Sequence, residues 1–281
     1  MAGASPSPSV SSTSSQVDPR VQYTFDIVNW DALSSLACKL HNVDSAQWGD
    51  QLSGGYNLVR FLHLHDARKR ILVARVPLRS EDAMSAEHDS AISKRIASEV
   101  ATMEYVASYT TIPVPEVSHH SAHAEGDVRS PYILMSKVAG APLSSVWNDM
   151  DDDKRHVILR QVIDILLELW SHRFDTKGAL FKKPDDSDGK GKDAWYIESS
   201  SMFTDPNDTG SRHRLSTTSY PHAADYWLAY ANAQLLDISH SNFGSDTKPY
   251  LHAQAWFMRS LIPALFDPAM DAGGCPLSPD Y

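Results

Sequence analysis

The stretch Gln47-Trp-Gly-Asp-Gln-Leu-Ser-Gly-Gly-Tyr-Asn-Leu-Val-Arg-Phe-Leu-His-Leu64 decides the fold. A glycine turn, Ser53-Gly54-Gly55, separates two runs, and in the second run Val59, Phe61 and His63 alternate with leucines and an arginine. Alternation with a period of two is typical of a strand, and glycines between two such runs are typical of a hairpin turn. We therefore predict a hairpin with strands over residues 47–52 and 56–64.

A third strand follows this hairpin. Residues 66–69 (Asp-Ala-Arg-Lys) indicate a turn, and residues 70–76 form an apolar run that contains Arg75. Pro77 closes the run, because proline has no N–H to donate to a strand ladder. Three consecutive antiparallel strands are the expected result.

The sheet is followed by a helix and two more strands. The helix is predicted over residues 92–109, where one apolar stripe has helical spacing. It ends before Thr111-Ile-Pro-Val-Pro115, because each proline disfavours the helical conformation in the residue that precedes it. Residues 117–120 and 132–137 are then predicted strands. The apolar stripe of the helix consists of Ile96, Val100, Met103 and Val106.

The second half of the chain is mainly helical in pattern. Helices are predicted over residues 154–172, 223–236 and 251–262, the last of them ending at Pro263. Residues 182–220 are polar and are expected to form an irregular insertion. A small sheet with one helix, followed by a helical half, predicts an α+β fold with segregated layers.

Length and charge exclude several classes of protein. The chain has 281 residues with 25 basic and 35 acidic side chains, a formal net charge of −10. A chain of this length buries enough surface for a core, so disorder throughout is excluded. An acidic balance repels phosphate backbones and anionic lipid surfaces, so we expect neither nucleic acid nor a membrane as partner.

The sequence also carries signals of cellular location. Residues 1–20 are predicted to form a disordered serine-rich tail, which lacks the pattern of a signal or transit peptide. Residues 157–170 form the longest apolar stretch, which is too short and too often interrupted to span a bilayer. The chain has two cysteines, Cys38 and Cys275, in neither a CxxC motif nor a disulfide framework. We expect a cytoplasmic protein.

Three features in this order form a candidate nucleotide site. Backbone amides at Gly54 and Gly55 can approach a polyphosphate, since no Cβ intrudes. Arg75 offers a positive charge, and Glu99 on the following helix can hold that cation as a buried ion pair. Taken alone, the glycines are also typical of an ordinary hairpin turn, and each charge is typical of a solvated side chain. The predicted nucleotide site therefore depends on the three features occurring together.

These residues resemble the fungal branch of the aminoglycoside phosphotransferase and choline kinase-like proteins. The resemblance implies a protein kinase-like fold, with a nucleotide-binding lobe over residues 21–135 and a hinge and incomplete helical lobe over residues 136–281. It further implies that backbone groups near Lys137 and Val138 contact adenine, and that ATP and magnesium are used. The resemblance is carried by seven segments: Leu52–Asn57, Ile71–Pro77, Ser98–Tyr105, Ile112–Val117, Pro131–Gly140, Phe174–Phe181 and Asp225–Trp227.

The resemblance also assigns a catalytic residue near the end of the sequence. The family's catalytic loop reads His-x-Asp with Asn five positions later, which places Asp280 as the catalytic Asp and Ser278 in place of His. The Asn position falls beyond Tyr281, so the magnesium ligands of that region are absent from the sequence. We expect a phosphotransferase that acts on a small-molecule hydroxyl but is inactive as the chain stands. The alternative is a non-catalytic, pseudokinase-like binding or interaction protein.

Two other side-chain clusters have competing interpretations. His119, His120 and His123 are metal-ligand types, but no nearby cysteine or carboxylate set completes a tetrahedral site, so we predict no metal site. Four tryptophans offer either a cage for a quaternary ammonium group or ordinary helix packing, which is the simpler explanation. These tryptophans are Trp170, Trp195, Trp227 and Trp256.

Overall fold

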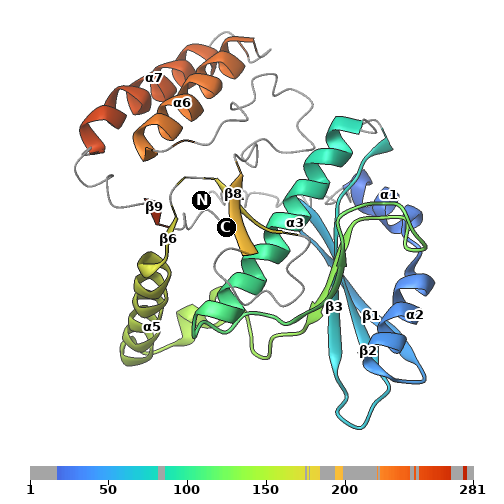
Figure 1. Ribbon diagram of the computed structural model, residues 1–281. Coiled ribbons are helices and arrows are strands. Elements are labelled where there is room, and N and C mark those ends of the chain that lie inside the picture. The colour runs from blue at the N-terminus through green and yellow to red at the C-terminus, as the bar shows by residue number, and fades with distance from the viewer. Residues whose placement is uncertain are drawn as a thin grey trace, which may run out of the picture.

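A computed structural model shows a mixed α and β chain built on a five-stranded antiparallel sheet (Figure 1). The sheet has the strand order β1-β2-β3-β5-β4. Its strands are β1 (Ala46–Ser53), β2 (Asn57–Leu64), β3 (Ile71–Pro77), β4 (Val117–Ser121) and β5 (Tyr132–Ser136). The structure describes residues 18–81, 86–174, 176, 178–183, 194–198, 220, 222–240, 244, 247–266 and 275–276. The predicted hairpin and third strand are confirmed to within one or two residues at each end.

Two helices that were not predicted cover one face of the sheet. They are α1 (Pro19–Ile27), whose first turn is capped by the side chain of Asp18, and α2 (Trp30–His41), which is capped by Asn29. Each begins with a residue type that favours the N-cap, and α1 has proline at its first position, so the start signals were present in the sequence. The predicted disordered tail over residues 1–20 therefore extends too far, because the helix begins at Pro19.

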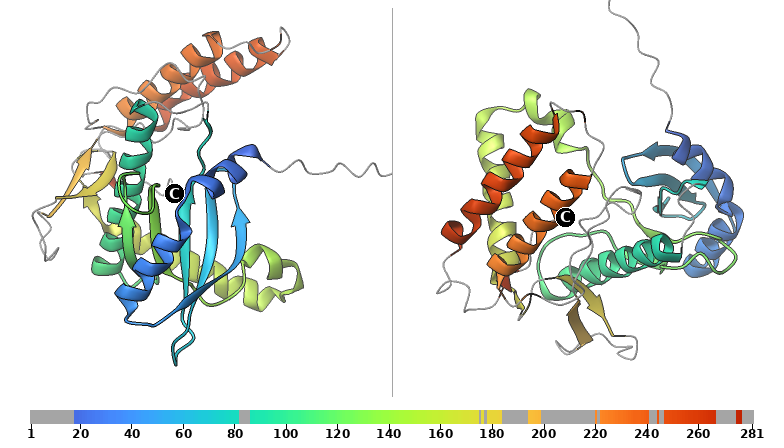
Figure 2. Two further views of the ribbon diagram at one scale, coloured as in Figure 1. Left: turned by 90° about the vertical axis from the view of Figure 1, so that its right-hand side faces the viewer. Right: turned by 90° about the horizontal axis from the view of Figure 1, so that it is seen from above.

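Successive side chains along the strands belong to two different apolar cores, one on each face of the sheet. Leu58, Leu62 and Leu134 are fully buried in the cluster beneath α1 and α2. Ile133, the neighbour of Leu134 on β5, packs instead with the helix α3 (Ala86–Tyr109). Successive side chains of a strand point to opposite faces, so α3 lies on the face opposite α1 and α2 (Figure 2). Helix α3 begins six residues before the predicted start at residue 92.

The second half contains short strands and helices. Helix α5 (Asp152–Ser171) follows α4 (Leu143–Val146) and the 3-10 turn η2 (Trp147–Asp149). Helices α6 (Ala223–His240) and α7 (Thr247–Leu265) pack against each other, away from the sheet (Figure 1). The short strands form two pairs: β6 (Arg173–Phe174) with β9 (Cys275–Pro276), and β7 (Ala179–Lys182) with β8 (Trp195–Glu198).

Two predictions for the second half are wrong in detail. Residues 195–198, placed in the irregular insertion, form strand β8, which lies against α3 through its partner β7. Gly178 permits this pairing, because a Cβ there would lie 2.3 Å from the carbonyl oxygen of Glu198. Pro263 lies inside α7 rather than ending it, and Phe266 N still donates to the carbonyl of Ile262. Pro263 has no N–H to donate and so removes one backbone hydrogen bond, and the helix ends two residues later, at Leu265.

No helix among the described residues combines the length and the apolar character that crossing a membrane requires.

Candidate functional site

Arg75 and Glu99 form an ion pair between the sheet and α3. Arg75 lies on β3, between Val59 on β2 and Ile133 on β5, and these residues alternate with the core positions beneath α1 and α2. Its guanidinium donates to the carboxylate of Glu99. The side chains are 28% and 17% exposed, so the pair is half-buried rather than buried. Partial removal from water strengthens the attraction relative to a surface pair.

The glycine turn lies at one end of the same hairpin. Gly54 N donates to the carbonyl of Asn57 at 3.0 Å, and Leu78 N donates to the carbonyl of Tyr56 at 2.8 Å. Neither Gly54 nor Gly55 is among the residues with positive φ, and a Cβ at either position would meet nothing within 4 Å. The fold itself therefore does not require glycine here. Close approach of a ligand to the backbone remains a physical reason for having two.

Asn57 joins the turn to the ion pair. Its side-chain amide lies beside Arg75, and with the oxygen turned toward the guanidinium it accepts hydrogen bonds from Nη2 at 3.1 Å and from Nε at 3.2 Å. Arg75 is thus held between Asn57 and Glu99. The structure brings the glycine turn, the strand cation and the helix carboxylate into one site.

An apolar surface, here called the apolar shelf, adjoins the ion pair on the same face of the sheet. It consists of Val59, Phe61, Val73 and Met135, all of them partly exposed. Phe61 pairs with Val73, which in turn pairs with Met135, so these three side chains lie side by side across three strands. Flat apolar rings can bind on such a surface, within reach of the charges at Arg75.

The predicted hinge residues follow β5 at the edge of this shelf. Lys137 N donates to the carbonyl of Ile71 at 3.1 Å, and its ammonium lies 5.3 Å from the centre of the Phe61 ring. Val138 is 63% exposed, and no hydrogen bond within the described ranges engages its backbone. The backbone of Val138 is therefore accessible to a ligand on the shelf.

Asp280 and Ser278 lie outside the described residues. The nearest described segment is β9, which pairs with β6 directly after α5.

The histidines have protein partners. His119 Nδ1 lies 3.0 Å from the hydroxyl of Tyr132, and His123 Nδ1 lies 3.2 Å from the hydroxyl of Ser93. Burial lowers the pKa of His120, which favours its neutral form. Across the part of the chain that the structure describes, no group of three or more His, Cys, Asp or Glu residues is arranged to hold a metal ion.

Three other aromatic side chains surround a cation that belongs to the protein itself, Arg60. The guanidinium of Arg60 lies 4.7 Å from the ring centres of Trp30 and Trp48 and 5.1 Å from that of Phe25. Burial lowers the pKa of Arg60. In contrast, Trp195 packs edge-on against Tyr105, and no ring contact joins any two of the four tryptophans considered as a cage, as far as the described residues go.

Two cavities lie near the other end of α3. One of about 520 Å³ is lined by Glu104, Lys182 and Trp195, and one of about 720 Å³ by Tyr105, His172 and Arg173. Neither is lined by the glycine turn or by the Arg75–Glu99 pair. They are separate from the predicted site.

Four residues beside the glycine turn were missed in the sequence: Asn57, Tyr56, Arg95, which lies over the Tyr56 ring, and Arg20, which donates to the Gly55 carbonyl. Tyr56 and Asn57 directly follow the glycine turn in the quoted stretch, but no pattern gave them a role. Arg95 lies four positions before Glu99, so both lie on one side of the same helix, and this spacing was a usable signal. Arg20 had no such signal, because the helix that carries it was not predicted.

Comparison with known proteins gives partial relatives. A subtelomeric hrmA-associated cluster protein of Aspergillus fumigatus is 34% identical over 132 residues, 47% of this chain and 24% of that protein. Altered inheritance of mitochondria protein 9, mitochondrial, of Clavispora lusitaniae is 32% identical over 145 residues, 50% of this chain and 23% of that protein. The chain thus spans about a quarter of the length of these curated relatives. No family model and no solved structure matches the chain.

The predicted cytoplasmic location is contradicted by these relatives. The protein of Clavispora lusitaniae and its counterparts in Lachancea thermotolerans and Saccharomyces cerevisiae are named as mitochondrial proteins. The cytoplasmic prediction depended on the pattern of the first residues and on cysteine usage, and the names of the relatives point to the mitochondrion instead.

Proposed function

We propose that this chain carries the nucleotide-binding lobe of a protein kinase-like phosphotransferase, whose complete form transfers the γ-phosphate of ATP to a small-molecule hydroxyl. The observation that carries the proposal is the ion pair between Arg75 and Glu99, positioned by Asn57 at the end of the glycine turn. A cation on the third strand paired with a carboxylate on the next helix is the arrangement that orients nucleotide phosphates in kinases. The antiparallel strand order, with α3 between β3 and β4, supports the same proposal.

The site provides a complementary surface for each part of the nucleotide. The apolar shelf offers Phe61, Val73 and Met135 to an adenine ring, and the exposed backbone of Val138 offers hydrogen-bonding groups to its edge. The glycine turn offers backbone amides to the phosphates. Arg75 contributes a permanent positive charge and a planar group that suits phosphate oxygens.

The described residues do not provide the magnesium site that phosphoryl transfer by this family needs. They hold no cluster of metal-ligating side chains, and Asp280 lies beyond them. We therefore derive nucleotide binding from this site and no transfer step.

One observation favours a second function, that of a nucleotide-binding protein without catalysis. The strand cation is Arg75, where kinases use lysine, and the two differ in geometry and hydration. Binding of ATP without loss of its γ-phosphate, in the presence of magnesium and amino-sugar or choline acceptors, supports this second function. Turnover that depends on the acceptor supports the first.

The proposal is tested by calorimetric titration of the purified chain with ATP and with adenosine. We expect Arg75→Ala to weaken ATP binding about tenfold to a hundredfold, the range for losing a hydrogen bond to a charged group. Arg68→Ala is the matched control, because it removes the same charge from an exposed turn at the far end of β2. Equal loss in both variants indicates a general charge effect and contradicts the proposed site.

We also propose a mitochondrial location, on the basis of the names of the relatives. Fluorescent tagging of the protein at its C-terminus, with a mitochondrial dye as reference, tests this location. A diffuse cytoplasmic signal contradicts it.

A further inference from the structure

Three consecutive residues, the last of the glycine turn and the two that follow it, are each contacted by an arginine from a different element. Gly55 is contacted by Arg20 of α1, Tyr56 by Arg95 of α3, and Asn57 by Arg75 of β3. Two of these arginines are paired with carboxylates, Arg20 with Asp18 and Arg75 with Glu99. Their charges are therefore largely balanced within the protein.

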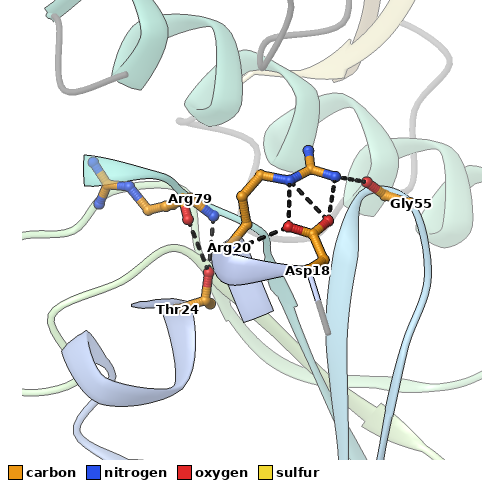
Figure 3. A network of polar contacts seen from close by, with 5 residues as sticks. All are labelled: Asp18, Arg20, Thr24, Gly55 and Arg79. Atoms are coloured by element: carbon orange, nitrogen blue, oxygen red, sulfur yellow. Dashed lines mark hydrogen bonds and ion pairs between the residues drawn. The ribbon is translucent and has the colours of Figure 1, made fainter. Parts of the chain in front are cut away.

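Arg20 fixes the orientation of the turn (Figure 3). Its guanidinium holds Asp18 through Nε and Nη2, and Nη2 also donates to the carbonyl of Gly55 at 3.2 Å. Because a trans peptide is planar, the N–H of Tyr56 points opposite to the Gly55 carbonyl and away from Arg20. This N–H has no hydrogen-bond acceptor among the described residues, so it is available to an anion on that side.

Arg95 is the cation at the turn whose charge is not balanced. Its guanidinium lies 5.0 Å from the centre of the Tyr56 ring, and no carboxylate within the described ranges forms an ion pair with it. It lies one helical turn before Glu99 and is partly exposed.

We propose that Arg95 is a phosphate-binding residue of this site and that the ring of Tyr56 holds its guanidinium ready for the phosphate chain of a nucleotide. This inference rests on the proposed nucleotide-binding function and deepens it by naming a further residue that binds the phosphates. Arginine binds phosphate oxygens through two parallel N–H groups, and a ring beneath the guanidinium leaves its edge free to do so. Arg75 positions the phosphates near Glu99, and Arg95 supplies the uncompensated charge.

The test compares Arg95→Ala with Lys94→Ala by calorimetric titration. Lys94 is the matched control, because it is adjacent on α3 and pairs with Glu198 of β8 at 2.6 Å instead of with the turn. We expect Arg95→Ala to weaken binding of ATP and of inorganic tripolyphosphate at least tenfold, to weaken ADP less, and to leave adenosine unchanged. Lys94→Ala is expected to bind all four as the unmodified chain does.

A second pair of variants separates a ligand role from a structural one. Tyr56→Phe keeps the ring and is expected to retain ATP binding, whereas Tyr56→Ala is expected to weaken it several-fold. Arg95→Lys keeps the charge and the helix and is expected to bind ATP more weakly than the unmodified chain but more tightly than Arg95→Ala. If Arg95→Ala and Arg95→Lys both bind ATP as tightly as the unmodified chain, the inference is overturned.

The outcomes distinguish this inference from the proposed function. ATP binding that needs Arg75 but not Arg95 supports the nucleotide site and overturns the role of Arg95. Binding of tripolyphosphate that needs Arg95, with no gain in affinity from the adenosine part of ATP, supports Arg95 as a phosphate ligand and contradicts the nucleotide function. Absence of binding to both ATP and tripolyphosphate overturns both.

Discussion

The two halves of the chain, the sheet with α1 to α3 and the helices from α5 onward, differ in how far their apolar side chains are buried. In the sheet half, Leu33, Leu58 and Leu62 are fully buried between α1, α2 and the strands. In the helical half, Leu167 and Trp170 on α5 are 63% and 59% exposed, and Trp256 on α7 is 57% exposed. Burial of apolar area is the main source of folding free energy. The sheet half therefore has its own core, whereas α5 and α7 carry apolar surface that no described residue covers.

The largest expected effect on the free energy of unfolding comes from shortening a buried side chain in the core of the sheet half. Leu62→Ala removes a fully buried side chain and is expected to lower the free energy of unfolding by about 2–5 kcal/mol. Leu167→Ala removes the same atoms from an exposed position on α5 and is expected to change it by less than about 1 kcal/mol. Urea unfolding followed by circular dichroism measures both. Similar losses in the two variants would show that α5 is as well packed as the sheet.

A smaller effect is expected where α1 is joined to the sheet. The hydroxyl of Thr24, which is fully buried, accepts from Arg79 N at 2.8 Å and lies 3.4 Å from the Arg79 carbonyl (Figure 3). Thr24→Val keeps the shape but leaves the buried N–H without this acceptor, which costs about 1–3 kcal/mol. Thr24→Ser keeps the hydroxyl and serves as the control, and thermal unfolding compares the two. A Val variant as stable as the Ser variant contradicts a role for this hydrogen bond in attaching α1.

The smallest expected effect concerns a contact between the two halves. Glu168 on α5 accepts from Thr111 N at 2.6 Å and from the Thr111 hydroxyl at 2.8 Å. These hydrogen bonds lower the pKa of Glu168, so its contribution is fully present above the unfolded pKa and is lost as pH falls through the lower, folded pKa. Hydrogen exchange of α5 at pH 7 and near pH 3 is expected to show less protection at the lower pH.

The control for this contact is Glu168→Gln, whose amide does not titrate in this range. In that variant the protection of α5 is expected to change less with pH than in the unmodified chain. An equal pH dependence in both chains would assign the effect to other carboxylates.

Local sequence patterns predicted the positions of those strands that are determined by residues close together in the chain. The period-two alternation at Val59, Phe61 and His63 located β2, and Pro77 marked the end of β3. The prediction of secondary structure failed for β8, which depends on a partner strand elsewhere in the chain. Residues 195–198 (Trp-Tyr-Ile-Glu) include strand-favouring types but were assigned to the polar insertion around them, and β7 supplies the hydrogen bonds that make them a strand. Helices α1 and α2 were missed although their capping residues were visible, and although Trp30, Leu33 and Ala37 have the spacing of an apolar stripe on α2.

The sequence by itself determined the hairpin, the third strand and the charge types at Arg75 and Glu99, since turn chemistry and alternation act between residues close in the chain. Tertiary structure alone decided that Arg20, Arg95 and Arg75 meet Gly55, Tyr56 and Asn57. These arginines come from a helix on one face of the sheet, a helix on the other face and a strand between them. Their meeting depends on how the two helices pack across the sheet, which no local pattern encodes.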